Sequence, residues 1–273
     1  MTRPISILTL AAVVTCLCAC TSKSPTTPAP MQGPTIWHNP VPDAYGGLKR
    51  WNAVRFFRFD LVVRDGDGKE LHRARHLWDK RTGDYRYEAD AGAFAALPFA
   101  DEEMHIWRPI DLELPPGALV ALVNRATGEG RIYIDGQEQP ATLVPRVLQR
   151  IDHDSFWLLL PFQTQGANLE GQIDRARGDK VLKLQYPVRP GQQGQDAWLL
   201  QLARDSWRIT RTQLHPRNSY RHVIAEWSGE KKVGGLTFAT IRKLDDGSLT
   251  FEHIALPRRV AGNVFTDVAT PLP

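Results

Sequence analysis

Cysteine is missing from almost the whole chain. The 273 residues include three cysteines, Cys16, Cys18 and Cys20, and all three lie within the first twenty residues. The rest of the chain therefore has no disulfide, no cysteine metal site and no thiol nucleophile. An exported protein without disulfides depends on its apolar core for stability.

Long runs of one charge are also absent. The formal net charge is +4, from 34 basic and 30 acidic residues. No Lys/Arg run is long enough to follow a phosphate backbone, which argues against a nucleic-acid partner. The small positive excess is compatible with weak attraction to anionic lipid headgroups. The 42% hydrophobic content and the eight tryptophans indicate a folded chain with a sizeable core.

The N-terminal segment has the layout of an export signal. Arg3 supplies positive charge, and the apolar stretch Ile5–Val14 follows it. This stretch is too short to span a bilayer, but its length suits the hydrophobic region of a signal peptide. We therefore predict that residues 1–19 are a signal peptide.

The end of this segment, Leu17-Cys18-Ala19-Cys20, resembles the lipobox of bacterial lipoproteins, where one aliphatic and two small residues precede the modified cysteine. The resemblance implies cleavage after Ala19 and a diacylglycerol on Cys20. Two or three acyl chains would make a durable membrane anchor. The alternative is an ordinary secretory signal with incidental cysteines.

Residues 20–35 are predicted to be the lipidated cysteine and a tether. The tether is rich in Pro, Ser and Thr and has nothing to bury, so it would hold a folded domain away from the membrane. Thr21 stands where an Asp would favour inner-membrane retention in enteric-type sorting. By that analogy, the predicted location is the outer membrane, facing the periplasm.

Short segments with strand periodicity dominate the rest of the chain. From Arg55 to Val63 apolar and polar residues alternate, as in a half-buried strand, and the apolar face comprises Phe57, Phe59, Leu61 and Val63. A turn at Asp65-Gly66-Asp67-Gly68 leads into a β-meander. Further strands are expected at residues 70–78, 84–88, 119–124, 131–135, 156–160, 180–186, 198–203, 207–214, 220–227, 235–243 and 249–256.

The clearest helix is predicted at Leu143–Asp152, where Val147, Leu148 and Ile151 fall on one face. A second, weaker helix is predicted at Asp43–Trp51, and residues 91–117 are expected to form a long irregular insertion. Short loops between consecutive strands require antiparallel pairing. The predicted fold is therefore mainly β: a strongly curved antiparallel sheet, or unclosed β-barrel, with one or two covering helices.

The order of these elements resembles the LolA/LolB-like superfamily of outer-membrane lipoprotein-sorting proteins over residues 45–256. The resemblance implies an unclosed β-barrel whose concave apolar face is covered by helices, and in carriers of this superfamily that cavity takes lipoprotein acyl chains. Residues 36–273 would then form a single LolA-like β domain. The resemblance depends on Trp78-Asp79, Gly83–Glu88, Asp154–Phe162, Lys180–Leu184, Trp207-Arg208-Ile209 and Val233–Leu236.

Three clusters have an enzyme-like or metal-like composition. Asp152-His153-Asp154-Ser155 contains triad residue types, but adjacent helical residues do not face each other, so Asp154 or Ser155 is more simply a helix-terminus or turn residue. Asp65–Gly68 resembles the start of a calcium loop, but Glu70 and His76 occupy the positions that require Gly and Glu. His72 and His76 lie about 13 Å apart on one strand face, too far for one metal. A solvated strand face is expected there.

We therefore expect a non-catalytic, membrane-anchored periplasmic lipoprotein that binds a hydrophobic ligand or a lipidated partner in an apolar cavity. No cofactor or metal is expected, and no phosphate loop, HExxH helix or GxSxG elbow is present. The alternative is a scaffolding lipoprotein with a closed core and a protein partner; a hydrolase ranks third. The predicted ligand-binding residues are Phe57, Phe59, Leu61, Val63, Val147, Leu148 and Ile151.

Overall fold

One antiparallel sheet organises the described chain. The computed structural model describes residues 39–95, 114–166, 168–173, 180–185, 197–215 and 222–273. The strands of the first half are β1 (Phe56–Asp65), β2 (Glu70–Asp79), β3 (Asp84–Asp90), β4 (Ala118–Asn124), β5 (Gly130–Ile134) and β6 (Gln137–Glu138). Those of the second half are β7 (Asn168–Ile173), β8 (Lys180–Gln185), β9 (Ala197–Leu202), β10 (Ile209–His215), β11 (Val223–Val233), β12 (Leu236–Leu244) and β13 (Gly247–Ala255).

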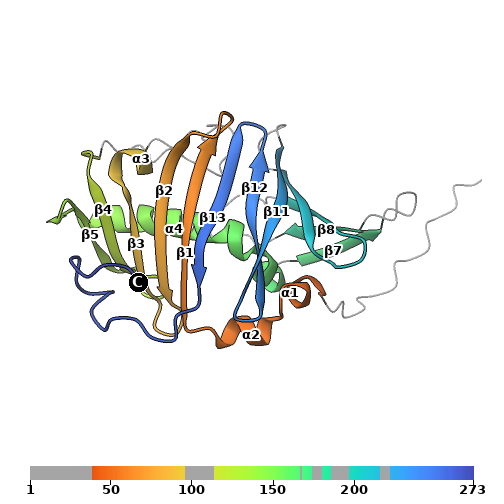
Figure 1. Cartoon of the computed structure of the whole chain (residues 1–273), viewed down its shortest axis with the longest axis horizontal. Coiled ribbons are helices and arrows are strands. Elements are labelled where there is room, and N and C mark those ends of the chain that lie inside the picture. The colour runs from red at the N-terminus through yellow and green to blue at the C-terminus, as the bar shows by residue number, and fades with distance from the viewer. Residues whose placement is uncertain (1–38, 96–113, 167, 174–179, 186–196, 216–221) are drawn as a thin grey trace, which may run out of the picture. The chain divides into compact units, whose positions relative to one another are not determined.

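The sheet is open. Its order is β6-β5-β4-β3-β2-β1-β13-β12-β11-β10-β9-β8-β7, so two meanders join where the first strand pairs with the last. Leu61 faces Phe251 across this central pair. β6 and β7 are the edge strands of this order and do not pair with each other. This confirms the mainly β, unclosed sheet expected from the sequence (Figure 1).

Strand alternation separates two faces, as the pattern of β1 predicted. Phe57, Phe59, Leu61 and Val63 all lie at 0–1% exposure in the apolar core. The side chains that alternate with these along β1, including Arg58 and Arg64, point to the opposite face. We call the apolar side, which α4 (Val144–Gln163) covers, the inner face, and the other side the outer face.

Helix α4 is longer than predicted. A short 3₁₀ turn, Ala141–Leu143, leads into twenty helical residues. The strand expected at Phe156–Leu160 is wrong, because this segment continues the helix. Its run of apolar residues suits a buried strand and a buried helix equally by periodicity, and Trp157, Leu158, Leu159 and Leu160 are indeed all buried.

Glycine divides the second predicted helix in two. The chain forms α1 (Val41–Ala44) and α2 (Leu48–Ala53) instead of one helix over Asp43–Trp51. Gly46 and Gly47 between them have φ values of 104° and 88°, which L side chains rarely adopt. A Cβ on Gly46 would also lie 2.5 Å from the carbonyl oxygen of Gly235, so the break brings α1 and α2 against the β11–β12 turn.

Two further boundaries differ from the sequence-based expectation. β11 continues through Ser228-Gly229, where a turn was expected, and the chain turns at Gly234-Gly235 instead. β7 was not predicted. Of the expected insertion at residues 91–117, α3 (Ala91–Ala95) and the last residues before β4 are described; the rest lies outside the described residues.

Candidate functional site

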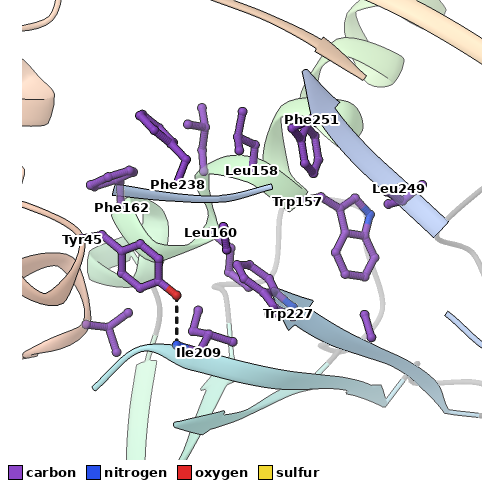
Figure 2. Close-up of a cluster of buried hydrophobic side chains, with 14 of the residues drawn as sticks. Tyr45, Trp157, Leu158, Leu160, Phe162, Ile209, Trp227, Phe238, Leu249 and Phe251 are labelled. Carbon is purple, nitrogen blue, oxygen red and sulfur yellow. Dashed lines mark hydrogen bonds between the residues drawn. The ribbon is translucent and has the colours of Figure 1, made fainter. Parts of the chain in front are cut away.

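The candidate site is the inner face of the sheet beneath α4. The second half of α4 packs on β1 and β8–β13, and we call this cluster the main core. Figure 2 shows Trp157, Leu158 and Leu160 of α4 among aromatic and aliphatic side chains of the sheet. Tyr45 closes one side, accepting a hydrogen bond from Ile209 N at 2.9 Å. Burial raises the pKa of Tyr45 to about 12, so this phenol stays neutral.

The first half of α4 packs on a different set of strands. Val147 and Ile151 are buried against residues of β2–β5, and Leu148 is partly buried against the same cluster, which we call the second core. The structure thus brings all seven predicted ligand-binding residues to the helix-covered face. It assigns Phe57, Phe59, Leu61 and Val63 to the main core and the three helix residues to the second.

These side chains pack on one another. Val147 and Ile151 are 2% and 0% exposed, and Phe59 stacks on His76 with ring centroids 4.2 Å apart. Two described hollows include charged side chains in their lining. One, of about 730 Å³, includes Arg211, Glu226 and Lys243, and one of about 660 Å³ includes Arg73, Arg75 and Glu88. The inner face is therefore apolar and closely covered in this conformation.

A buried polar cluster interrupts the apolar layer between α4 and β2–β3. The Asp154 carboxylate lies 2.8 Å from Arg150 Nε and 3.5 Å from His76 Nε2. His76 Nδ1 is 2.9 Å from the Tyr85 hydroxyl, and the Tyr87 hydroxyl is 3.5 Å from His72 Nε2. Asp154 and His76 have no exposed surface. A charge pair and a histidine therefore connect the helix to the sheet inside the protein.

The charge state of this cluster follows from burial and from Arg150. Burial opposes ionisation of Asp154, but the Arg150 cation and the nearby His153 and His76 rings outweigh it and hold the carboxyl pKa below its usual range. Burial lowers the pKa of His72 to about 4 and also lowers that of His76. At neutral pH the cluster contains one ion pair and neutral histidines.

Two sequence-based interpretations of these residues were wrong. His72 and His76 are buried at 2% and 0% exposure, whereas a solvated strand face was expected. Asp154 lies in the middle of α4 and not at its end. Strand alternation in β2 could have predicted this burial. The register places His76 opposite Phe59 and Ala74 opposite Leu61 on the inner face.

The remaining enzyme-like and metal-like patterns are explained locally. Ser155 Oγ donates a hydrogen bond to the carbonyl oxygen of Asp152, so its proton is directed at the helix backbone. Asp65 Oδ1 accepts from the backbone N–H groups of Asp67 and Lys69, which makes Asp65–Gly68 a hairpin turn as expected. Among the described residues, no group of three or more His, Cys, Asp or Glu side chains could hold a metal ion.

A second polar link joins α4 to the sheet at the main core. Arg242 of β12 is fully buried and donates to the carbonyl oxygen of Trp157 at 2.6 Å. Its guanidinium lies 3.2 Å from the ring centroid of Trp227, a favourable cation–π geometry. Burial lowers the pKa of Arg242 to about 9, so the side chain stays cationic at neutral pH.

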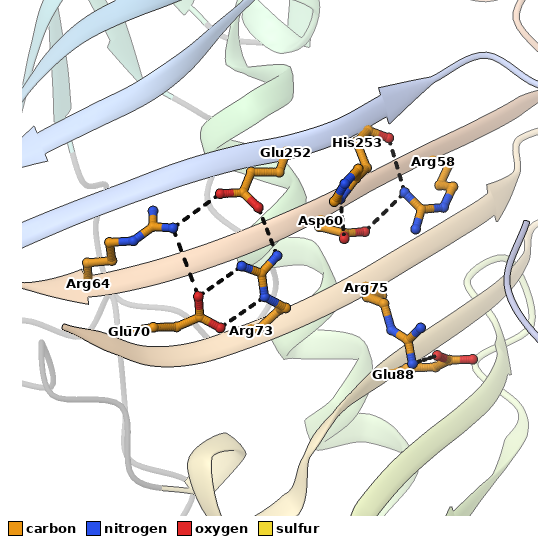
Figure 3. Close-up of polar contacts among 9 residues, drawn as sticks. All are labelled: Arg58, Asp60, Arg64, Glu70, Arg73, Arg75, Glu88, Glu252 and His253. Atoms are coloured by element: carbon orange, nitrogen blue, oxygen red, sulfur yellow. Dashed lines mark hydrogen bonds and ion pairs between the residues drawn. The ribbon is translucent and has the colours of Figure 1, made fainter. Parts of the chain in front are cut away.

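The outer face is polar and extensively ion-paired. Figure 3 shows Arg73 between Glu70 and Glu252, each with a nearest N–O distance of 2.8 Å. On the same face, Arg86 is 2% exposed and donates to the carbonyl oxygens of Val264, Asp267 and Val268. The C-terminal segment after β13 is therefore held on the outer face, away from α4.

In the part of the chain that the structure describes, no helix has both the length and the apolar character needed to cross a membrane.

Solved structures align with most of this chain at low sequence identity. No protein-family model matches the sequence, and no curated protein matches it significantly. A DUF1329 family protein from Desulfovibrio piger aligns with a TM-score of 0.44 and 10% identity, covering 82% of this chain and 95% of that one. A LolA superfamily protein from Nitrosomonas europaea gives 0.43 and 13%, covering 81% and 96%.

A putative outer membrane lipoprotein-sorting protein domain from Vibrio parahaemolyticus gives a TM-score of 0.39 and 7% identity, covering 80% of this chain and 93% of that one.

Proposed function

We propose that this chain is a non-catalytic, membrane-anchored periplasmic lipoprotein that binds acyl chains of a hydrophobic ligand or lipidated partner beneath α4. The observation that carries this proposal is the inner face itself. A broad apolar surface is covered by one helix, and polar groups fix that helix at two places: Asp154 beside His76, and Arg242 on the Trp157 carbonyl.

Apolar packing beneath α4 can be exchanged for a ligand, whereas the polar contacts define the docked position of the helix. Apolar packing between two surfaces is non-directional and tolerates exchange of one apolar partner for another, whereas the two polar contacts set where α4 returns. An acyl chain that replaces part of the helix packing would meet Phe57, Phe59, Leu61 and Val63 from the sheet. Val147, Leu148 and Ile151 would meet it from the helix.

The energy available is sufficient for useful affinity. Each buried methylene contributes about 0.8 kcal/mol, so a sixteen-carbon chain supplies on the order of 10 kcal/mol before the costs of displacing α4 and of association. Those costs favour ligands with one or two long chains.

The anchor is part of the proposal and is supported by the N-terminal residues. Leu17-Cys18-Ala19-Cys20 has the pattern of a lipobox, and the Pro/Ser/Thr-rich residues 21–35 have the composition of a tether. Thr21 favours the outer membrane by the sorting analogy. Acyl chains on Cys20 would hold the protein at the membrane, close to a source of lipid ligands.

A scaffold is the second candidate, and the close packing of the inner face favours it. Phe57, Leu61 and Ile151 have no exposed surface, as expected of a permanently closed core. In that case the protein would act through a partner on its surface, and α4 would not move.

A pair of neighbouring substitutions separates the two candidates. Leu61 and Val62 are adjacent in β1 and both are fully buried, but Leu61 pairs with Ala74 and Phe251 on the inner face while Val62 points to the outer face. We expect brominated fatty acid to quench the buried tryptophans saturably, and Leu61→Ala to tighten binding several-fold by removing packing that competes with the ligand.

Val62→Ala serves as the control, because it deletes buried apolar atoms on the opposite face. It should leave the quenching curve of the wild type unchanged. If neither the wild type nor Leu61→Ala shows saturable quenching, while circular dichroism shows intact folds, the scaffold is the better explanation.

A further inference from the structure

Charge is segregated between the two ends of the strands. At the end where β1 meets β2 and β12 meets β13, the turns contribute acidic side chains, and the two turns are neighbours, since a Cβ on Gly66 would lie 3.9 Å from the Asp246 carbonyl oxygen. We call this end the acidic rim; its acidic residues include Asp65, Asp67, Asp90, Asp135, Asp245 and Asp246.

The opposite end is basic. Helix α2 lies there with the β11–β12 turn and the chain that follows β13, along the lower edge of the sheet in Figure 1. Arg50 Nη1 donates to Gly235 O at 2.9 Å, and a Cβ on Gly234 would meet the side chain of Leu256. We call this end the basic rim; its exposed basic residues include Lys49, Arg50, Arg81, Lys231, Lys232, Arg258 and Arg259.

Exposed carboxylates at the basic rim, among them Glu129 and Asp205, are fewer than the exposed basic residues, and two of the rim's carboxylates are ion-paired. Asp79 accepts two hydrogen bonds from Arg55, and Glu230 pairs with Arg208. Lys49, Lys231 and Lys232 are exposed beyond these pairs. The rim therefore presents a positive potential to solvent despite the modest net charge of the whole chain.

The chain also enters the described structure at this end. Asn39 precedes α1, and the backbone N–H of Thr237, at the start of β12, donates to the carbonyl oxygen of Tyr45, just after α1. Asn39, the first described residue, therefore lies at the same end as the basic rim.

We propose that the basic rim is a docking surface for an anionic membrane and holds the anchored protein with α2 toward the lipid headgroups. This inference rests on the proposed function, since it takes lipidated Cys20 as the anchor. The acidic rim is repelled by the same surface, so the two ends act together to set one orientation. The β1–β2 turn then faces away from the membrane.

The absence of cysteine after Cys20 provides a direct test with the whole mature chain. A single cysteine is introduced at Asn52, exposed on α2, or at Asp246 on the acidic rim, and is labelled with a maleimide dye. The lipidated protein is placed in vesicles of phosphatidylcholine, with or without phosphatidylglycerol, that carry a headgroup nitroxide quencher. We expect stronger quenching at position 52 than at position 246 on phosphatidylglycerol vesicles only.

Charge variants report whether the basic rim causes this orientation. Each basic residue near an anionic surface changes the ratio of docked to undocked protein by about fivefold at low salt. Lys49→Ala with Lys232→Ala should therefore lower that ratio by about thirtyfold. The matched double variant Lys69→Ala with Lys243→Ala changes two lysines near the acidic rim. It should leave the ratio of docked to undocked protein unchanged. Raising salt from about 0.1 M to about 1 M should abolish the preference.

The outcomes separate this inference from the function beneath it. Equal quenching at positions 52 and 246 on anchored protein overturns the membrane-docking surface and leaves the basic rim to an acidic protein partner. If the anchor is absent, the wild-type chain itself takes the dye at Cys20 and does not sediment with phosphatidylcholine vesicles, which overturns the lipoprotein assignment.

Discussion

The Asp154–Arg150 pair offers the sharpest prediction about what fixes α4 to the sheet. Asp154→Ala removes the carboxylate that lies 2.8 Å from Arg150 Nε, in a position with no exposed surface. The Arg150 guanidinium, 7% exposed, then loses its counter-charge in an apolar layer. Breaking a buried pair by removing one partner costs about 3–5 kcal/mol, a large share of the stability of a domain.

Asp152→Ala is the matched control. It makes the same chemical change in the same helix, but the Asp152 side chain is 52% exposed and pairs with Arg125 at the surface. A surface pair contributes less than about 1 kcal/mol. Because Asp to Ala raises helix propensity equally at both positions, the difference between the two variants isolates burial.

Guanidinium unfolding followed by tryptophan fluorescence measures both variants. We expect a midpoint shift several-fold larger for Asp154→Ala, with the slope of the unfolding transition unchanged. The double variant Arg150→Met with Asp154→Leu should recover most of the loss, because an apolar pair replaces the buried charges without orphaning either. Equal destabilisation by Asp152→Ala and Asp154→Ala would refute the reasoning.

Three further predictions address the anchor, the pH response and the C-terminal segment. Cys20→Ala should abolish incorporation of a fatty-acid analogue in metabolic labelling, because the thiol is the acyl acceptor; label on the variant would disprove the anchor. His72 has a folded-state pKa of about 4 against about 6.5 unfolded, so the unfolded chain binds the extra proton. Its contribution is therefore fully present above pH 6.5 and falls by about 3 kcal/mol as the pH drops toward 4; His72→Gln should reduce the measured pH dependence. Arg86→Lys cannot reproduce the bonds to three carbonyl oxygens, and it should speed hydrogen exchange and proteolysis of residues 264–268 without affecting α4.

The sequence predicts the sheet more completely than it predicts which side chains lie on the inner face. Alternation at Phe57, Phe59, Leu61 and Val63 has one physical meaning, a strand with one buried face, and the structure agrees. The segment Phe156–Leu160 has no such period, because helix and strand both bury a continuous apolar run. Only the sheet on which it packs decides between them.

The polar cluster could not be derived for a different reason. His76 and Asp154 come from β2 and from α4, far apart in sequence, and each is more often solvent-exposed when considered alone. Their burial depends on the register that places His76 beside Phe59 and on the longer course of α4. Local sequence patterns reveal neither the strand register nor the length of α4.

The central claim, that acyl chains bind beneath α4, is tested most directly by native mass spectrometry. The mature protein, extracted in mild detergent and kept from organic solvent, should carry one or two non-covalent adducts with masses of acyl lipids. Denaturing solvent should release them and leave the covalent mass of lipidated Cys20 in place. A protein that shows only its covalent mass, even after incubation with excess fatty acid, would contradict the claim.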